Sequence, residues 1–197
     1  MLDLSNVTLI CLTNQKFKEH EEAMNKSSEG IKWGARKVIY DQDCTSIDEW
    51  NRKIVFELHQ YVQTEYAMLI HADGYVINPD VWKDSWLDYD YIGAPWPLPR
   101  DTFSYRDSKG NLIRVGNSVS LRSKRLLELP ARLNLPWRPY YGYTNEDGFL
   151  CVHNRQILEE NGCRFAPLSE AIHFSKEHQI EENKDIEKTF AFHTVDV

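Results

Sequence analysis

Apolar and amphipathic stretches alternate along the first third of the chain. Residues 7–13 (VTLICLT) form a near-continuous apolar run with β-branched side chains, which is typical of a parallel strand covered on both faces, and residues 36–40 and 66–70 are shorter strand candidates. Residues 15–26 carry helix-forming side chains, and residues 47–63 place apolar side chains at helical spacing after a capping box, Ser46 to Glu49. This order of strands and helices predicts right-handed parallel crossovers, the first half of a nucleotide-binding α/β layer.

The remaining two thirds of the chain are less regular. We predict a strand over residues 90–94, a Pro-rich surface loop over 95–110, and a bent strand or strand pair over 111–123 that is interrupted at 116–118. A short helix over 124–133 is expected to break at Pro130, and after a turn at 136–143 an amphipathic helix is expected from Asn145 to Gly162, which suits the C′ position. Residues 163–166 are a last strand candidate, and 173–193 read as a charged connector.

Composition and charge limit the class of protein. A chain of 197 residues suits one well-buried core, so we predict a single domain over 1–197. No apolar run approaches the roughly 20 residues that cross a bilayer, and the amino terminus lacks the features of a signal peptide, so we expect no transmembrane segment and a cytoplasmic location. A net charge of −7 argues against a nucleic-acid partner. The four cysteines are expected to be reduced structural thiols.

Polar residues follow the predicted strands directly. His71-Ala72-Asp73-Gly74 ends the strand over 66–70, with Gly74 expected in an unusual backbone turn, and Thr13 and Asn14 follow the first strand. Ligands of open α/β sheets bind at the carboxyl ends of the strands, so these residues are candidates for a nucleotide site. Asp41, which follows the second strand, is a candidate contact to a base or ribose.

The interruption of the predicted strand at Gly116, Asn117 and Ser118 has two interpretations of equal weight. Small residues here would let the backbone approach a donor closely, or the segment is a β-bulge. Trp96 stands between Pro95 and Pro97 in an extended loop and is a candidate sugar-stacking side chain. The other aromatic residues between 82 and 91 are expected to be core and wall.

Several segments together resemble glycosyltransferases of the GT-A type: HAD after a strand, VGNS in a bent strand, NED at a helix start and FAFH near the end. The segments ADGYVINPDVW, YDYIGAPW, SLRS, NEDGFLC, HFSKE and TFAFH more closely resemble a family of small, mostly uncharacterised bacterial and viral glycosyltransferase-like domains. The resemblance covers roughly residues 66–193. It implies a GT-A fold, a Rossmann-like mixed sheet flanked by helices, with a nucleotide-sugar donor (a UDP-sugar is favoured), a sugar or glycan acceptor, Mn²⁺ or Mg²⁺, and a role in polysaccharide or glycan synthesis.

The resemblance also implies a metal site. GT-A enzymes usually carry Asp-X-Asp after this strand, and its last acid binds the cation, so Asp73 matches this ligand and His193 matches the terminal metal-binding histidine. His71 replaces the first acid. It is a candidate for the metal or the donor ribose, although a lone histidine at a strand end is more often a partner of the backbone. Asp73 has its own alternative, because Asp-Gly also caps turns.

In the GT-A pattern the third residue of NED supplies the general base, which assigns Asp147 to this role, with Glu146 close behind. The alternative is that both are first-turn acids that complement the helix dipole. The HFSKE segment, with His173, Ser175 and Glu177, is equally compatible with a structural role.

The function expected from the sequence is therefore a metal-dependent, inverting glycosyltransferase. The alternative from another class is a non-catalytic nucleotide- or carbohydrate-binding module, which the missing first acid of the motif makes credible. A third possibility, a metal-dependent phosphoester hydrolase, needs more clustered carboxylates than the sequence offers.

Overall fold

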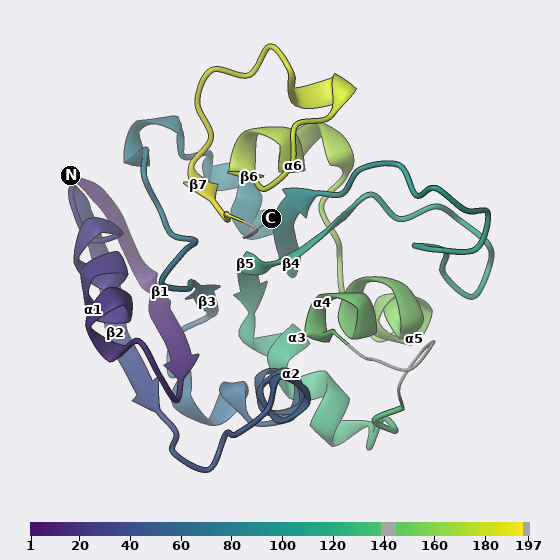
Figure 1. Cartoon of the computed structure of the whole chain (residues 1–197), viewed down its shortest axis with the longest axis horizontal. Helices are drawn as coiled ribbons and strands as arrows, with labels where there is room; N and C mark the ends of the chain where they lie inside the picture. Colours follow the sequence, from purple (N-terminus) through teal and green to yellow (C-terminus); the bar gives the residue numbers. More distant parts are fainter. Residues whose placement is uncertain (139–144, 195–197) are drawn as a thin grey trace.

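The structure, a computed structural model, describes residues 1–138 and 145–194. A five-stranded sheet in the order β2-β1-β3-β5-β4 organises the chain (Figure 1). The strands β1 (Leu2–Thr13), β2 (Ile31–Tyr40) and β3 (Tyr66–Leu69) are parallel, as predicted. The strand β5 (Val115–Ser123) pairs with β3, and β4 (Tyr91–Pro95) pairs with β5. Both pairings are antiparallel, so the sheet is mixed.

Successive side chains of β1 point to opposite faces of the sheet, and a different helix packs on each face. Val7, Leu9 and Cys11 pack in one apolar cluster with the buried face of α1 (Phe17–Lys26). Ile10 and Leu12 belong to a second cluster, which contains Ile54 of α2 (Ile47–Phe56) and Leu58 of the following 3₁₀ helix η1 (Leu58–Tyr61). Because β1 is buried on both faces, it shows the continuous apolar run from which it was predicted.

The capping box at the start of α2 is formed as predicted. The backbone N–H of Glu49 donates to Ser46 Oγ at 3.2 Å, and the Glu49 carboxylate accepts the N–H of Ser46 at 3.1 Å. Helix α2 therefore begins at Ile47, directly after the loop that follows β2.

Two helix predictions in the second half were wrong in detail. Helix α3 (Lys124–Arg132) continues through Pro130, where a break was expected. Proline removes one hydrogen bond, to the carbonyl of Leu126, and the helix ends two residues later, while the ring is buried with Leu129 in the apolar face. Because only two helical residues follow Pro130, the loss of this one hydrogen bond is tolerated.

The helix expected from 145 to 162 is divided into α4 (Glu146–Gly148), a π-helical turn η4 (Phe149–His153) and α5 (Arg155–Glu160). Asn154 ends the π turn, because its backbone N–H and its side-chain amide both donate to the carbonyl of Phe149 at 3.0 Å. Gly162 has φ +87° and follows α5 as the predicted C′ residue, with the N–H of Cys163 bonded to the carbonyl of Leu158 at 3.0 Å. The turn predicted over 136–143 lies partly outside the described residues.

The last segments differ most from the prediction. Residues 163–166 form an isolated bridge, Phe165 to Tyr91, instead of a strand. Helix α6 (Leu168–Phe174) follows, and the charged connector contains β6 (Ser175–Lys176), the 3₁₀ helix η5 (Glu181–Asn183) and β7 (Ala191–Phe192). Two further 3₁₀ helices, η2 (Pro79–Val81) and η3 (Asp84–Asp88), precede β4. Figure 1 shows α6, β6 and β7 gathered beside one end of β4 and β5.

The burial of thiols and aromatic side chains agrees with the sequence. All four cysteines are free and buried, and Trp86 and Tyr91 are fully enclosed core residues. No helix among the described residues has the length and apolar character needed to cross a membrane.

Candidate functional site

A cleft of about 480 Å³ lies at the carboxyl ends of β1 and β3. Its volume is within the range of small-molecule sites, about 300–1,000 Å³. Its walls come from the loop after β1, the start of α2, the turn after β3, β5 and the segment after β7. Half of the residues that the sequence marked as candidates line this cleft, namely Thr13, Asn14, His71, Asp73, Ser118 and His193.

The loop after β1 is tied to the rest of the cleft through polar side chains. The Asn14 amide donates to the carbonyl of Cys44, and the Thr13 hydroxyl donates to the carbonyl of Gln15. Trp50 of α2 donates from its indole N–H to the carbonyl of Leu12 at 2.8 Å, which places its ring on the cleft wall. These bonds tie the loop after β1 to the loop before α2 and to α2 itself.

Lys16 and His20 also line the cleft, although the sequence reading did not single them out. Lys16 has φ +52° and precedes α1, and His20 Nδ1 lies 2.8 Å from the carbonyl of Lys16. Of the cleft-lining residues that the structure describes, Lys16 is the only lysine or arginine. Its place in the loop after the first strand was the one available signal, because no motif marks it.

Asp73 and His193 meet at one end of the cleft. The carboxylate Oδ1 of Asp73 lies 3.7 Å from Nε2 of His193, and the N–H of Thr194 donates to the carbonyl of Asp73 at 3.0 Å. The Asp73 side chain is half exposed. Backbone hydrogen bonds of 2.7 and 3.4 Å between His71 and Gly74 close the turn that carries Asp73. Asp73 itself lines the cleft.

Gly74 is required by close packing and not by the unusual backbone turn expected from the sequence. Its φ is not among the positive values, which are found at Gly30, Gly110 and Gly162. A Cβ at position 74 would lie 2.6 Å from both His193 Cδ2 and Val119 Cγ2. The glycine therefore lets the chain after β7 approach the turn that carries Asp73.

His71 lies between two aromatic rings, 5.2 Å from the ring of Trp50 and 5.3 Å from the ring of His193. Its Nε2 is buried and has no hydrogen-bond partner among the described residues. Burial lowers the pKa of His71 well below its ordinary 6.5, and the nearby His193 acts in the same direction. The ring is therefore neutral, and its backbone, not its Nε2, makes the hydrogen bonds of the turn.

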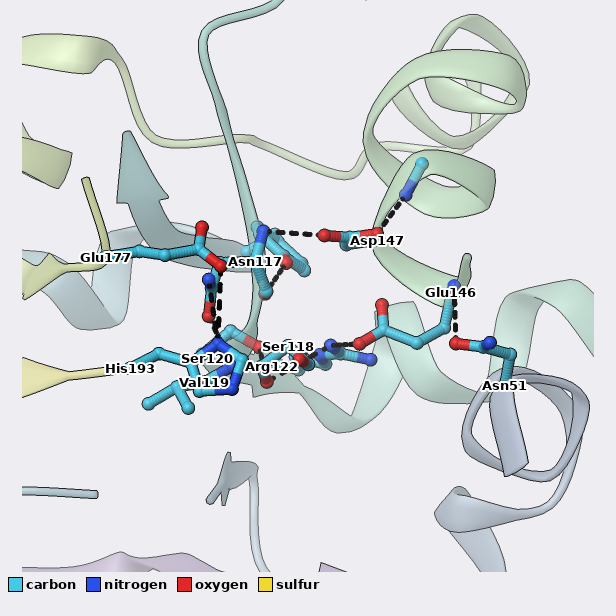
Figure 2. Close-up of polar contacts among 12 residues, drawn as sticks. Asn51, Asn117, Ser118, Val119, Ser120, Arg122, Glu146, Asp147, Glu177 and His193 are labelled. Carbon is cyan, nitrogen blue, oxygen red and sulfur yellow. Dashed lines mark hydrogen bonds and ion pairs between the residues drawn. The ribbon is translucent and has the colours of Figure 1, made fainter. Parts of the chain in front are cut away.

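Asn117 and Glu177 surround the opposite nitrogen of His193 (Figure 2). His193 Nδ1 lies 3.2 Å from Asn117 Nδ2 and 3.4 Å from Glu177 Oε1. Burial alone would raise the pKa of Glu177, but hydrogen bonds from His193 and Asn117 hold it below its usual value. Burial opposes the charge on His193, and Glu177 and Asp73 nevertheless raise the pKa of this imidazole above its ordinary value.

Asn117 also connects this cluster to Asp147. Its backbone N–H donates to Asp147 Oδ2 at 3.0 Å, and the N–H of Gly148 donates to Oδ1 at 2.7 Å. Burial raises the pKa of Asp147 despite these bonds. Asn117 has φ +81° where the register of β5 against β4 shifts. This irregularity agrees with a β-bulge, one of the two interpretations of residues 116–118.

Glu146 forms a buried ion pair with Arg122, beside this cluster. Its Oε1 lies 3.1 Å from Arg122 Nη2, and its backbone N–H donates to Asn51 Oδ1 at 3.0 Å. Burial raises the pKa of Glu146 to about 7, although Arg122 opposes the shift. Arg122 was missed from the sequence, where it reads as an ordinary strand residue of SLRS.

Three other candidates lie outside the lining of the cleft. Asp41 forms an ion pair with Lys53 at the end of β2. Trp96 is 7% exposed and stacks on Tyr105 with 4.9 Å between ring centroids. Gly116 lies under that indole, because a Cβ there would be 1.8 Å from Trp96 Cζ2. The structure does not bring these three residues to Asp73.

The residues present fit a cation at Asp73 and His193 only in part. Among the described residues no group of three or more His, Cys, Asp or Glu is arranged to hold a metal ion. The 3.7 Å between Asp73 Oδ1 and His193 Nε2 lies between the separations of about 3 Å for adjacent and about 4 Å for opposite ligands of an octahedral Mg²⁺. The pair suits a hard cation that takes its other ligands from phosphate oxygens and water.

The fold is similar to that of a glycosyltransferase of known structure. A crystal structure of a glycosyltransferase involved in the glycosylation of the major capsid of PBCV-1 matches it with a TM-score of 0.59 and 13% sequence identity, covering 95% of this chain and 91% of that chain. The structure and this likeness confirm the predicted fold class, an α/β fold with a mixed sheet flanked by helices. The chain belongs to the family described as Protein of unknown function (DUF5672), whose model matches residues 40–193. No curated protein matches the chain.

Proposed function

We propose that this protein is a metal-dependent glycosyltransferase that moves a sugar from a nucleoside-diphosphate sugar to an acceptor hydroxyl. The observation that carries the proposal is the cleft at the carboxyl ends of β1 and β3, which ends in the pair Asp73 and His193. Nucleotides bind at this edge of open α/β sheets. The likeness to a glycosyltransferase structure supports the same class.

The donor diphosphate would lie between the loop after β1 and the turn after β3. Thr13, Asn14 and Lys16, at and after the end of β1, line the cleft together with Asp73 and His193. A divalent cation held by Asp73 and His193 would stabilise the charge that develops on the leaving diphosphate. The Lys16 ammonium would add to this stabilisation. A UDP-sugar is the favoured donor from the family resemblance.

Asp147 is the residue that we assign as general base. Two backbone N–H groups hold its carboxylate, and burial raises its pKa toward the value at which a base is most effective. Glu146 is 1% exposed and forms an ion pair with Arg122. We therefore assign it the structural role of supporting the neighbouring Asp147. One base on a fixed helix start suffices for an inverting displacement, which is the mechanism we propose.

One observation favours a second candidate, a non-catalytic nucleotide- or carbohydrate-binding module. The turn after β3 carries one carboxylate where glycosyltransferases of this type usually carry two, and no three-ligand metal group is formed in the described part of the chain. Such a module would bind a nucleotide in the same cleft without releasing nucleoside diphosphate from a nucleotide sugar.

Thermal unfolding tests the donor site. UDP, GDP, ADP, CDP and TDP would each be added with and without Mn²⁺ to the wild type, to Asp73→Ala and to Asp185→Ala, an exposed acid outside the cleft. A nucleotide present at 100 times its Kd stabilises the folded state by about 2.7 kcal/mol, which raises the Tm by about 5–10 °C for a chain of this size. We expect this rise for one nucleotide with Mn²⁺, unchanged in Asp185→Ala and lost in Asp73→Ala. If no nucleotide shifts the wild type at saturation, the donor site does not exist.

A further inference from the structure

We propose that His20 is a donor-binding residue, which accepts a hydrogen bond through Nε2 from a hydroxyl group of the bound nucleotide sugar. The inference rests on the proposed function and deepens it, because it names a contact by which the cleft selects its donor. Hydroxyl groups of this chemistry are present both on the ribose and on the transferred sugar.

His20 lies in the first turn of α1, on the side of the helix that packs against the sheet. The buried residues of α1 are His20, Ala23 and Met24, which share one side at helical spacing. Ala23 and Met24 belong to the apolar cluster of that face of the sheet, whereas His20 lines the cleft. Only 7% of His20 is exposed, so the surrounding residues hold its ring in place at the cleft wall.

A hydrogen bond of the other ring nitrogen orients the imidazole. His20 Nδ1 lies 2.8 Å from the carbonyl oxygen of Lys16, and the backbone N–H of His20 donates to the same oxygen at 3.1 Å. A carbonyl oxygen only accepts hydrogen bonds, so the proton of the neutral ring is on Nδ1. The Nε2 atom then carries a lone pair and is an acceptor.

Three histidines line the cleft, and they differ in what their ring nitrogens can bind. The two ring nitrogens of His193 face Asp73 and Glu177, and Nε2 of His71 is enclosed. Nε2 of His20 bonds none of the described residues, and it is not among their enclosed polar atoms. Of these three rings, His20 therefore has the free acceptor that a ligand in the cleft can reach.

The chemistry of a nucleoside-diphosphate sugar decides which of its groups suits this acceptor. The diphosphate oxygens are ionised and only accept hydrogen bonds, so they do not pair with a lone pair on Nε2. A hydroxyl group donates, and its loss from the ligand would leave a nearly enclosed acceptor unpaired, which lowers affinity. His20 would thus favour a donor that carries a hydroxyl group at the contacting carbon.

Two substitutions separate the roles of the two ring nitrogens. In His20→Asn the side-chain amide can replace Nδ1 at the carbonyl of Lys16 but does not reach the position of Nε2. In His20→Gln the amide reaches that position and offers an oxygen acceptor. Glu21→Gln, an exposed position of the same helix, is the control.

Isothermal titration in the presence of Mn²⁺ would compare UDP, its 2′-deoxy and 3′-deoxy forms and UDP-glucose, or the same compounds of another base if the thermal screen selects one. Circular dichroism without ligand checks that each variant is folded. We expect His20→Asn to bind UDP-glucose about 3–10-fold more weakly than the wild type does, which is the size of one hydrogen bond. His20→Gln should recover part of this loss, and Glu21→Gln should bind as the wild type does.

The ligands separate the two sources of the hydroxyl group. A ribose contact predicts that the loss in His20→Asn is already present with UDP and disappears with one of the deoxy forms, whereas a contact to the transferred sugar predicts a loss with UDP-glucose alone. Equal affinities of the wild type and His20→Asn for every ligand, or a loss with UDP that persists with both deoxy forms, would overturn the inference and leave the proposed function standing. Failure of the wild type to bind any nucleotide would instead refute the proposed function, and the inference with it.

Discussion

Removal of Arg122 and removal of Glu146 should cost the fold different amounts of free energy, although they break the same ion pair. Both side chains are enclosed, with 0% and 2% of their surface exposed and 3.1 Å between Arg122 Nη2 and Glu146 Oε1. Glu146→Leu leaves a guanidinium that cannot lose its proton, because an arginine side chain stays charged throughout the pH range of a folded protein. Stranding such a buried charge destabilises proteins by about 3–5 kcal/mol.

Arg122→Met leaves a group that can become neutral. The pKa of Glu146 is raised from 4.5 to about 7 in the folded protein. At pH 7 the carboxyl group of the wild type is therefore already partly neutral, and full protonation costs less than about 1 kcal/mol more. The lost hydrogen bond from Arg122 Nε to Ser120 Oγ, 2.8 Å long, adds about 1 kcal/mol, for a total of about 1–2 kcal/mol.

Urea unfolding at pH 7, followed by circular dichroism, measures both values. We expect the loss in Glu146→Leu to exceed that in Arg122→Met by about 2 kcal/mol, with equal m-values, and the double variant Arg122→Met/Glu146→Leu to recover part of the loss. An Arg122→Met variant that is as unstable as Glu146→Leu would refute the assigned state of the carboxyl group.

Three further predictions address pH, packing and chemistry. Between pH 4.5 and about 7 the folded protein binds more protons at Glu146 than the unfolded chain does. The contribution of this group to the free energy of unfolding is therefore full below pH 4.5 and is lost as the pH rises through 7. Thermal melts across this range should lose that part of the pH dependence in Glu146→Gln. Gly74→Ala should displace His193 and weaken Mn²⁺ binding in an isothermal titration, whereas Gly148→Ala, whose Cβ would meet nothing nearer than 4.0 Å, should not. Asp147→Asn should lower the transfer rate about 10²–10⁴-fold with donor binding unchanged, and the wild-type rate should fall with decreasing pH at a value above the ordinary 3.8 of an aspartate; full activity in Asp147→Asn would exclude it as the base.

The first half of the fold was predictable because its signals are local. A strand buried on both faces reads as an apolar run, and the capping box before Ile47 marks the start of α2. Parallel strands end at one edge of the sheet, so Thr13 and Asp73, 60 residues apart in sequence, were expected near one another and line the same cleft.

The contacts that organise the site were not predictable, since they join distant segments. Glu177 and His193 meet through a two-residue ladder, too short to show a period of its own. Arg122 shares its strand pattern with surface residues, and its partner Glu146 lies 24 positions away. Gly74 was assigned to an unusual turn because the residue that packs against it, His193, lies far away in the sequence.

Release of nucleoside diphosphate from a panel of nucleotide sugars tests the transferase most directly, with Mn²⁺ and a mixture of sugar and glycan acceptors. We expect release from one donor that requires both Mn²⁺ and an acceptor, is lost in Asp73→Ala and Asp147→Asn, and persists in Asp185→Ala. Binding of that donor in the cleft without release, across the acceptors tested, would contradict the transferase and identify the protein as a binding module of the same fold.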